Sequence, residues 1–507
     1  MQNNKEKYTE KIKRYLHAGI PILYIESFEE NRIYQILLDA IRDWNYSIIE
    51  YNSRGIFCDG SKEKDNKDLS RVLSLFISSD KSNEFYNPNH KLLLIKDAVK
   101  RLDDPAVIGA LKYFAEAIIS GKYDTRIVIV SSVVSIPKEL EHLITLVSMK
   151  YPSREEIKSI IDDFCNENDT SPTDLLKIKL INSMKGMTSF DIQNTLSLAF
   201  LTNGKLTEDS LKVVIEQKKQ SLQKSGILEM IDVPDDLYEK VGGLNNIKRY
   251  LERKNVILQN IDDAESFKIE PPKGFLIAGL PGCGKSLTAK AAAAKFKVPL
   301  IRLDMGRMMG KYVGESEANL RHAIQIADAI SPCVLWVDEL EKAFSGVGGQ
   351  GSNAELTTRL MGNFLTWMQE KNSLSFVIAT VNNISSIPAE LLRKGRFDEL
   401  FYVDLPNAIE REDILRIHIE KRYSKDLKEI DLESIAQDMD GYSGADIEGV
   451  VKDALEECYC RNKCNLCEDA LRDAMSQSHP LEEIMKDEIE EMRTGYEKRR
   501  FKNASGE

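Results

Sequence analysis

The sequence has no long apolar run, and this absence already excludes a class of protein. Its longest apolar stretches, such as residues 21–25 and 127–130, have the length of buried strands. They fall short of the roughly 18 residues that a membrane span needs. The polar start, residues 1–6, is not followed by the apolar segment of a signal peptide. We therefore expect a cytoplasmic protein without a membrane partner.

Cysteine and histidine are also scarce. Eight cysteines in 507 residues, without even spacing, exclude a disulfide framework and favour a reducing compartment. The six histidines show no ligand spacing, and we expect His322 and His418 on helix surfaces. The only suggestive group is a cysteine cluster near the end of the chain, which is considered below.

Basic residues are outnumbered, with 69 Lys and Arg against 81 Asp and Glu and a net charge of −12. This balance argues against a general nucleic-acid binder. Hydrophobic residues make up 42% and charged residues 30%, which excludes wholesale disorder. At about 150 residues per domain, the length predicts about three domains, or two that are each subdivided.

Short apolar runs alternate with longer segments of helical period from end to end. This alternation is typical of an α/β fold with a mostly parallel sheet. In the second half we expect strands at residues 274–278, 300–303, 334–337 and 376–379. Residues 406–475 and 480–500 have helical patterns, and the polar tail after them is expected to fray.

Two segments of the first half recur in the second half in the same order. Residues 129–140 and 378–391 each run from an apolar strand through a polar turn to Ser-Ile-Pro-x-Glu-Leu. Residues 186–192 resemble residues 441–447. The repetition indicates a duplicated module whose first copy has diverged. Two unrelated α/β domains are the alternative.

The strand at residues 274–278 is followed by a match to the phosphate-binding pattern G-x-x-x-x-G-K-[ST]. The segment reads Gly279-Leu280-Pro281-Gly282-Cys283-Gly284-Lys285-Ser286. A segment with strong helix propensity follows it, beginning at Leu287. The glycines of the loop let backbone N–H groups wrap a phosphate, while Lys285 can reach the β- and γ-phosphates and Ser286 can ligate Mg²⁺. This Walker A pattern predicts a nucleoside triphosphate site. Cys283 within it raises the hypothesis that nucleotide binding is sensitive to oxidation.

An acidic pair follows a later strand. Residues 334–337 are apolar and end in Asp338 and Glu339. In phosphoryl transfer the first carboxylate helps to hold Mg²⁺, and the second orients or polarises the attacking water. Together with the phosphate loop, this Walker B pattern predicts hydrolysis of the triphosphate.

These motifs resemble the AAA ATPases over residues 233–475. The resemblance implies a P-loop parallel sheet with a helical lid, and ATP with Mg²⁺ as cofactors. It implies that the backbone of Val241 and Gly242 contacts adenine and that Asn382 is a sensor near the γ-phosphate. Gly444 and Ala445 resemble the second sensor, whose backbone approaches the nucleotide. One departure is Thr380-Val381-Asn382, where the family usually has Ala-Thr-Asn, and this puts the local packing in doubt.

The resemblance also extends to segments that act between subunits. Arg393 and Arg396 match the family's arginine-finger segment, which implies that they reach a neighbouring subunit's site and stabilise charge on the γ-phosphate. The implied assembly is a homo-oligomeric ring, a hexamer by analogy with the family. A solvated loop is the alternative for the two arginines.

A further match concerns substrate contact. The run Lys311-Tyr312-Val313-Gly314 resembles the first pore loop, which grips a polypeptide in the axial channel. A Tyr–Val pair that only packs is the alternative. Residues 346–352, which are rich in glycine, lie where the family has its second pore loop, and a loop without function is equally open.

The resulting layout has five parts. We expect a degenerate AAA-like α/β domain at residues 1–150, a small helical subdomain at 151–225, an AAA+ ATPase core at 226–405, a helical lid at 406–476 and a charged helix with a tail at 477–507. This layout is similar to the plastid and cyanobacterial hypothetical-reading-frame AAA subgroup and its bacterial relatives.

The first copy lacks the residues that the chemistry needs. Its first strand, residues 22–25, is followed by Glu26, Glu29 and Glu30 in place of a glycine loop, and these carboxylates would repel phosphate. Lys96 and Asp97 stand where the second copy has its acidic pair. We therefore expect no hydrolysis here and a structural or regulatory role, such as receiving a protein substrate or an adaptor. Residues 61–67 are expected to form a solvated loop.

The cysteine cluster consists of Cys458, Cys460, Cys464 and Cys467. Its spacing leaves a zinc or iron–sulfur site open. On a continuous helix, however, Cys458 and Cys460 would project about 200° apart and could not share a metal.

The sequence thus predicts a Mg²⁺-dependent, ring-forming AAA ATPase that remodels or threads a protein partner. A slow nucleotide-dependent switch or assembly scaffold is the alternative. A nucleic-acid-associated motor is disfavoured by the net charge of −12.

Overall fold

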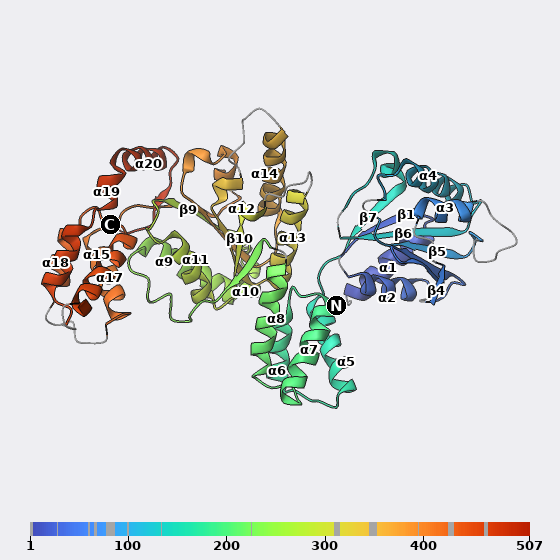
Figure 1. The fold of residues 1–507 in the computed structure, drawn as a ribbon, viewed down its shortest axis with the longest axis horizontal. Coiled ribbons are helices and arrows are strands. Elements are labelled where there is room, and N and C mark those ends of the chain that lie inside the picture. The colour runs from blue at the N-terminus through green and yellow to red at the C-terminus, as the bar shows by residue number, and fades with distance from the viewer. Residues whose placement is uncertain are drawn as a thin grey trace. The chain divides into compact units, whose positions relative to one another are not determined.

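The computed structural model describes most of the chain, and Figure 1 shows its fold. The described residues are 4–27, 29–58, 61–64, 68–77, 87–98, 101–132, 134–224, 226–308, 315–343, 352–393, 395–423, 430–460 and 465–506. The chain divides into two compact units, Met1–Lys218 and Lys219–Glu507.

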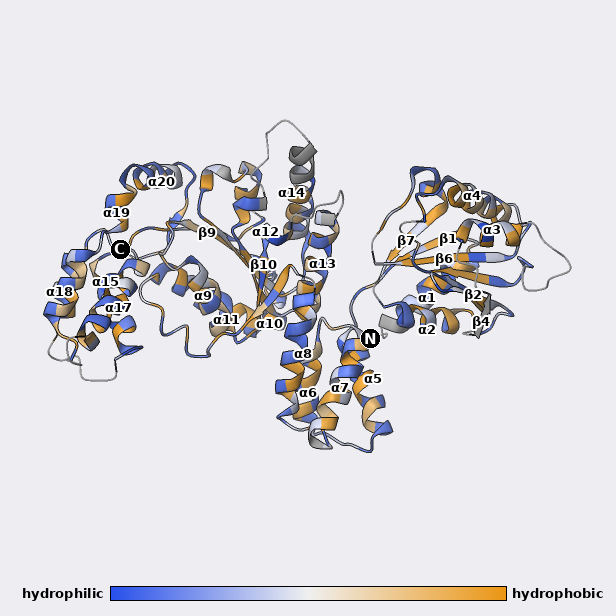
Figure 2. Ribbon diagram, in the orientation of Figure 1, coloured by the Kyte–Doolittle hydropathy of each residue, from blue (hydrophilic) through white to orange (hydrophobic). Residues whose placement is uncertain are grey.

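A seven-stranded sheet forms the centre of the first unit, in the order β4-β3-β2-β5-β6-β1-β7. Neighbours from β2 to β7 in this order run parallel, and β3 and β4 continue the sheet antiparallel. The strands are β1 (Ile22–Glu26), β2 (Ser47–Asn52), β3 (Gly55–Cys58), β4 (Ser61–Lys64), β5 (Lys91–Ile95), β6 (Thr125–Ser131) and β7 (Ile144–Ser148). Figure 2 shows the hydrophobic residues that line the inner strands, as expected for a parallel sheet covered on both faces.

Helices cover the two faces of this sheet and then form a subdomain of their own. One face packs against α3 (Leu69–Ile77) and α4 (Pro105–Ile119), and the other against α1 (Asn4–His17) and α2 (Glu30–Ala40). A separate hydrophobic core joins the following helices. These are α5 (Arg154–Glu167), α6 (Asp174–Met184), α7 (Ser189–Asn203) and α8 (Ser210–Lys224). A capping box of Ser153 and Glu156 begins α5.

The second unit is also built on a seven-stranded sheet, in the order β14-β13-β9-β12-β11-β10-β8. Its strands are β8 (Leu228–Ile231), β9 (Gly274–Gly279), β10 (Leu300–Asp304), β11 (Cys333–Asp338), β12 (Ser375–Val381), β13 (Glu399–Val403) and β14 (Lys502–Asn503). All neighbours pair in parallel except β8, which runs antiparallel to β10. The strands at residues 274–278, 300–303, 334–337 and 376–379 are confirmed within one or two residues.

Core helices and lid helices follow the strands of the second unit. The core helices are α9 (Asn245–Gln259), α10 (Ile261–Ser266), α11 (Lys285–Phe296), α12 (Met305–Met308), α13 (Glu315–Ile330) and α14 (Ser352–Glu370). The lid helices share a separate hydrophobic core. They are α15 (Ala408–Glu420), α16 (Leu432–Asp438), α17 (Gly444–Cys460) and α18 (Glu468–Gln477). The chain then forms α19 (Leu481–Ile484) and α20 (Lys486–Lys498).

The two sheets share one topology. Five parallel strands are common to the two units, and the second unit adds β14 as a sixth. When these five are numbered along the chain, they lie in the order 5-1-4-3-2 in both units. In the first unit these are β7, β1, β6, β5 and β2, and in the second β13, β9, β12, β11 and β10. Each sheet is followed by a helical subdomain. This arrangement confirms the predicted fold class, including a first AAA-like α/β domain with its own small helical subdomain.

Two local predictions are wrong. The tail after α20 does not fray, because Lys502 and Asn503 pair with Phe401 and Tyr402 and extend the second sheet. Residues 61–64 form the strand β4 and not a loop, because their backbone pairs with β3. Both strands form through partners that are set by the fold, which a polar local sequence does not reveal.

In the described part of the chain, none of the helices combines the length and the apolar content that crossing a membrane requires.

Candidate nucleotide site

A pocket of about 830 Å³ lies in the second unit between the α/β core and the lid. This volume is typical of a small-molecule site. Three groups of residues line it. The loop after β9 contributes Gly282, Cys283, Gly284 and Leu287, the segment before α9 contributes Val241, Gly242 and Leu244, and the lid contributes Ile414, His418, Gly444 and Ala445. His418, which was expected on a helix surface, lies half-buried on α15 and faces the pocket.

The loop between β9 and α11 turns through left-handed glycines. Gly282 has φ 78° and Gly284 has φ 86°, and α11 begins at the next residue, Lys285. A Cβ on Gly282 would lie 2.9 Å from the Cβ of Ala445, and the Ala445 N–H donates to the Gly282 carbonyl at 3.2 Å. Glycine is thus required both for the turn and for the close approach of the lid. The N-terminus of α11 offers free N–H groups to an anion.

Lys285 is folded back onto its own loop. Its Nζ donates to the carbonyl oxygens of Gly279 at 2.8 Å and Leu280 at 2.7 Å. The side chain is buried, and this burial lowers the pKa of Lys285 to about 8. Pro281 and Ser286 are exposed on either side of it. A phosphate group in the loop would give the buried ammonium a charged partner.

Cys283 is a poor candidate for a redox-sensitive group. Burial raises the pKa of its thiol to about 12, so the reactive thiolate is scarce at neutral pH. This argues against the hypothesis that oxidation of Cys283 controls nucleotide binding.

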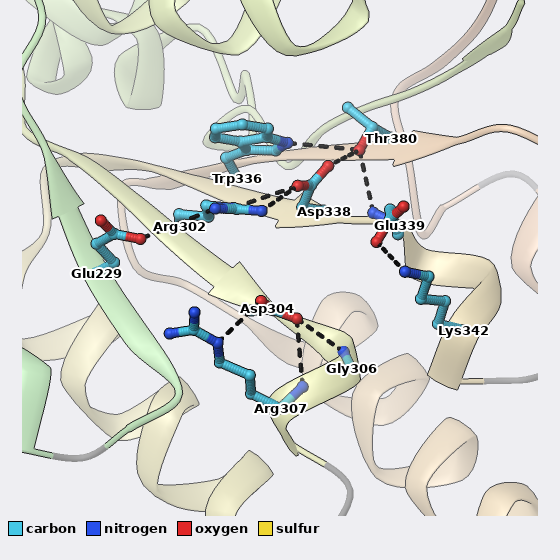
Figure 3. A network of polar contacts seen from close by, with 10 residues as sticks. All are labelled: Glu229, Arg302, Asp304, Gly306, Arg307, Trp336, Asp338, Glu339, Lys342 and Thr380. Atoms are coloured by element: carbon cyan, nitrogen blue, oxygen red, sulfur yellow. Dashed lines mark hydrogen bonds and ion pairs between the residues drawn. The ribbon is translucent and has the colours of Figure 1, made fainter. Parts of the chain in front are cut away.

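Asp338 ends β11 with both carboxylate oxygens engaged (Figure 3). Oδ1 accepts from the Thr380 hydroxyl at 2.8 Å, and Oδ2 accepts from Nη2 of Arg302 at 2.7 Å. Arg302, which lies on the adjacent strand β10, also stacks over the ring of Trp336, with 5.2 Å to the ring centroid. Glu229 on β8 lies 3.8 Å from the same guanidinium. The sequence motifs did not identify Arg302.

Glu339 follows directly and adopts a left-handed backbone, with φ 51°. Such a conformation costs energy in a residue other than glycine, and such residues cluster at functional sites. Its N–H donates to the Thr380 hydroxyl at 3.2 Å, and its carboxylate pairs with Lys342 at 2.5 Å. Thr380, the departure from the family's usual Ala-Thr-Asn, therefore orients both members of the acidic pair.

Asn382 lies beside a third carboxylate, also missed by the motifs. The Asn382 N–H donates to Oε1 of Glu341 at 3.0 Å. Oε2 of Glu341 is buried without a hydrogen-bond partner among the described residues. Glu341 and Asp338 both act to raise the pKa of Lys285 against the effect of burial. The carboxylates after β11 and the lysine of the loop thus belong to one electrostatic site.

The donors of this site fit Mg²⁺. The hydroxyl of Ser286 and the carboxylate of Asp338 are hard oxygen ligands, and Glu341 has an unused oxygen nearby. Among the described residues, no group of three or more His, Cys, Asp or Glu side chains is arranged to hold a metal by itself.

The wall before α9 depends on contact with the lid. The Leu244 N–H donates to Oε1 of Glu410 in α15 at 2.9 Å. Gly243 has φ 65°, and a Cβ there would lie 2.5 Å from the same oxygen. A Cβ on Gly242 would lie 2.9 Å from Cγ1 of Ile414. Glu410 thus joins the lid to the pocket wall, a role that the sequence did not indicate.

The remaining predicted residues lie away from the pocket lining or outside the described residues. Arg393 is exposed, and Arg396 is half-buried and donates to the Glu390 carbonyl. Lys311, Tyr312, Val313, Gly314 and residues 346–351 lie outside the described ranges, as does Cys464. The helix α17 continues through Cys460, with Cys458 buried and Cys460 and Cys467 exposed.

The first unit fills the position of the phosphate loop with its own side chains. Glu29, after β1, pairs with Arg32 at 2.8 Å and accepts a hydrogen bond from the N–H of Ser189, where α7 begins. Arg32 also pairs with Glu156 of α5 at 2.6 Å. All three charged side chains are at most 10% exposed. Core and helical subdomain are thus joined by an internal ion-pair cluster.

The first unit also has an ion pair whose charges are opposite to those of Arg302 and Asp338 in the second unit. Lys96 pairs with Glu50 of β2 at 2.9 Å. The two pairs occupy equivalent register positions. Glu50 lies opposite Leu94, and Lys96 is two residues after Leu94. In the same way Arg302 lies opposite Trp336, and Asp338 is two residues after Trp336. The two units therefore carry the same cross-strand ion pair with opposite signs, and the first has an ammonium group where the second has a carboxylate.

Comparisons with known proteins cover both units. The model of the ATPase family associated with various cellular activities (AAA) matches residues 275–405, and an AAA+ lid domain matches residues 429–459. The N-terminal and second domains of SpoVK-like AAA ATPases match residues 8–149 and 155–225.

Relatives align with nearly the whole chain. A protein of Pyropia yezoensis named "Uncharacterized AAA domain-containing protein ycf46" is 32% identical over 502 residues, which cover 98% of this chain and 99% of the relative. The protein of the same name from Guillardia theta is 32% identical over 486 residues, covering 96% and 94%. This agrees with the subgroup predicted from the layout. The chain therefore belongs to the AAA ATPase family.

Proposed function

We propose that the second unit binds ATP with Mg²⁺ in the pocket between its core and its lid, and hydrolyses the nucleotide there. One observation carries the proposal. The phosphate loop and the lid line a single pocket, and the carboxylates of Glu341 and Asp338 lie close enough to influence the loop lysine. The first unit, by contrast, fills the equivalent positions with internal ion pairs.

Binding follows from the loop and the pocket wall. The backbone N–H groups of residues 282–286 and the N-terminus of α11 surround the phosphates. Lys285 leaves the loop carbonyls and pairs with the β- and γ-phosphates. Val241 and Gly242 contact the base, while Gly444 and Ala445 hold the lid against the nucleotide. Ser286 and Asp338 would hold Mg²⁺, which neutralises phosphate charge when bound.

Hydrolysis depends on the acidic pair and on neighbouring subunits. Glu339 exchanges its contact with Lys342 for the attacking water and accepts its proton. Asn382 orients the same water. In a homo-oligomeric ring of hexameric form, Arg393 and Arg396 of one subunit stabilise the charge on the γ-phosphate in the next. Their exposed or half-buried position at the surface of the chain supports this role.

Two variants test binding and hydrolysis separately. Lys285→Ala is expected to abolish ATP binding, and Glu339→Gln is expected to bind ATP but to lose at least about a hundredfold in hydrolysis rate. Lys290→Ala, which changes another lysine of α11, is the matched control. Hydrolysis by Glu339→Gln at the parent rate would contradict the assignment of Glu339.

The protein-directed role needs a test of its own. Protein remodelling by the ring is the proposed output, with Lys311, Tyr312, Val313 and Gly314 as the contact to a polypeptide. A partner captured by Glu339→Gln in ATP supplies the substrate for the assay. Tyr312→Ala should then lose remodelling while hydrolysis is retained. Retained remodelling would favour the nucleotide-dependent switch or scaffold.

A further inference from the structure

The segment that follows α20 closes one edge of the second sheet. Lys502 and Asn503 form β14 beside β13, and the Ala504 N–H donates to the Tyr402 carbonyl at 2.8 Å. Ala504 is fully buried. We call residues 501–506 the edge segment. Its backbone hydrogen bonds fix its register against the sheet.

The edge segment also caps the helix that begins beside the nucleotide pocket. The Ala504 carbonyl accepts from the N–H groups of Asn246 at 3.0 Å and Ile247 at 3.3 Å, in the first turn of α9. The N-cap residue of this helix, Leu244, makes no side-chain capping bond. The first N–H groups of a helix need an outside acceptor. Here the acceptor comes from a segment more than 250 residues away.

A side chain fastens the same junction. Nδ2 of Asn246 donates to the carbonyl oxygens of Asn503 at 3.1 Å and Ser505 at 2.6 Å. One residue of α9 therefore holds the edge segment through both its backbone and its side chain. Ser505 itself lines the pocket, next to Val241, Gly242 and Leu244.

The helix α20 anchors the segment from its other side. Tyr496 of α20 stacks on Tyr402 of β13 at 5.3 Å between ring centroids, and Phe501 packs against Tyr496. Arg493 makes a two-pronged ion pair with Asp404, at 2.7 and 2.9 Å. Asp404 is another lining residue of the pocket. The anchoring is therefore continuous from α20 to the pocket wall.

We propose that the edge segment is a positioning element of the nucleotide site. It holds the start of α9, and with it the wall of Val241 and Gly242, in the conformation that receives the nucleotide. The inference rests on the proposed ATP site and adds a determinant of its affinity that lies outside the phosphate loop, the acidic pair and the lid. Because no hydrogen bond or ion pair joins the described residues of the segment to the phosphate loop or the acidic pair, it acts on binding and not on the chemical step.

The test separates affinity from turnover. Asn246→Ala removes the side-chain bonds to the segment, and Ala504→Pro removes the N–H that pairs with Tyr402. Each variant is expected to raise the Kd for a fluorescent ATP analogue and the KM for ATP about tenfold, the effect of one or two hydrogen bonds. The kcat should stay within about twofold. Ala504→Gly keeps the backbone donor and acceptor of residue 504, so this variant should bind with the affinity of the parent.

Lys498→Ala, at an exposed position near the end of α20, is the matched control and should behave as the parent. Hydrogen exchange of the full chain supplies a second readout. If the edge segment favours ATP binding, thermodynamic linkage requires that bound ATP also stabilises the edge segment. ATP should therefore slow hydrogen exchange at the Ala504 N–H in the parent. A folding defect would instead lower protection throughout the second unit.

The outcomes distinguish the inference from the proposed function. If the parent neither binds nor hydrolyses ATP, the proposed function fails. If the parent does both, and Asn246→Ala and Ala504→Pro keep its Kd, the edge segment is not a positioning element. A tenfold loss of kcat with unchanged KM in Asn246→Ala and Ala504→Pro would contradict the inference as well.

Discussion

At the scale of single residues, Arg302 is the main addition to the predicted site. Its guanidinium lies between Glu229 and Asp338 and over Trp336 (Figure 3). Asp338 is only 15% exposed, so its carboxylate needs hydrogen-bond partners. Thr380 and Arg302 supply them, one to each oxygen. The orientation of the acidic pair is thus set by residues outside the Walker B pattern.

Removing Arg302, the charged partner of Asp338, should destabilise the second unit. Arg302→Met keeps the aliphatic stem but leaves Oδ2 of Asp338 unpaired, and we expect a loss of about 1–3 kcal/mol in the free energy of unfolding. Arg302→Lys should restore part of it. Urea unfolding followed by tryptophan fluorescence measures the difference. Arg307→Met should stay within about 0.5 kcal/mol, because the Arg307 side chain is 69% exposed in its ion pair with Asp304. Equal stability of the Arg302 and Arg307 variants would contradict this account.

At the scale of elements, the start of α9 and the lid helix α15 depend on each other. Glu410 completes the capping box of α15 with Asn407 and also accepts from the Leu244 N–H. Its carboxyl oxygen occupies the space where a side chain at Gly243 would begin. The lid is therefore in direct contact with the pocket wall before α9.

A methyl group at this contact should weaken nucleotide binding. Gly243→Ala places a Cβ 2.5 Å from Glu410 in a left-handed conformation, so the wall or the lid must shift. We expect the Kd for ATP to rise at least about tenfold, with a loss of about 1–3 kcal/mol in stability. Gly362→Ala, in α14 with no atom near its Cβ, is the control and should be neutral or stabilising. Unchanged affinity in Gly243→Ala would exclude this coupling.

The elements also show what the sequence could and could not predict. The strands of the second core and the loop at Lys285 have local signals, namely apolar runs and a fixed glycine spacing. The bonds of Arg302 to Asp338 and of Leu244 to Glu410 span 36 and 166 positions, and only the fold brings these residues together. The strands β4 and β14 are too short and polar for any periodicity to reveal them.

At the scale of the whole molecule, the two units share one sheet topology but place opposite charges at equivalent positions. The second unit leaves its loop and pocket open to a ligand, whereas the first fills them with Glu29, Arg32 and Glu156 and replaces the acidic residue with Lys96. Internal charges thus stand where phosphate and metal would bind. Under the proposed function, these charges give a physical reason for the first copy to keep the fold without a nucleotide site.

Breaking the internal cluster should loosen the first unit alone. Arg32→Met leaves two buried carboxylates without a cation, at a cost of about 3–5 kcal/mol. Hydrogen exchange should then increase in residues 153–203, while ATP binding by the second unit is retained. Arg42→Ala, which removes an exposed pair with Asp39, should change neither. Protection equal to that of the parent in Arg32→Met would contradict the role of the cluster.

The number of nucleotides bound per chain tests the central claim, that only the second unit is a nucleotide site. Equilibrium binding of ATP with Mg²⁺ to the full-length Glu339→Gln chain avoids turnover during the measurement. We predict saturation at one nucleotide per chain and no binding once Lys285→Ala is added. Saturation at two nucleotides, or binding that survives Lys285→Ala, would contradict the account.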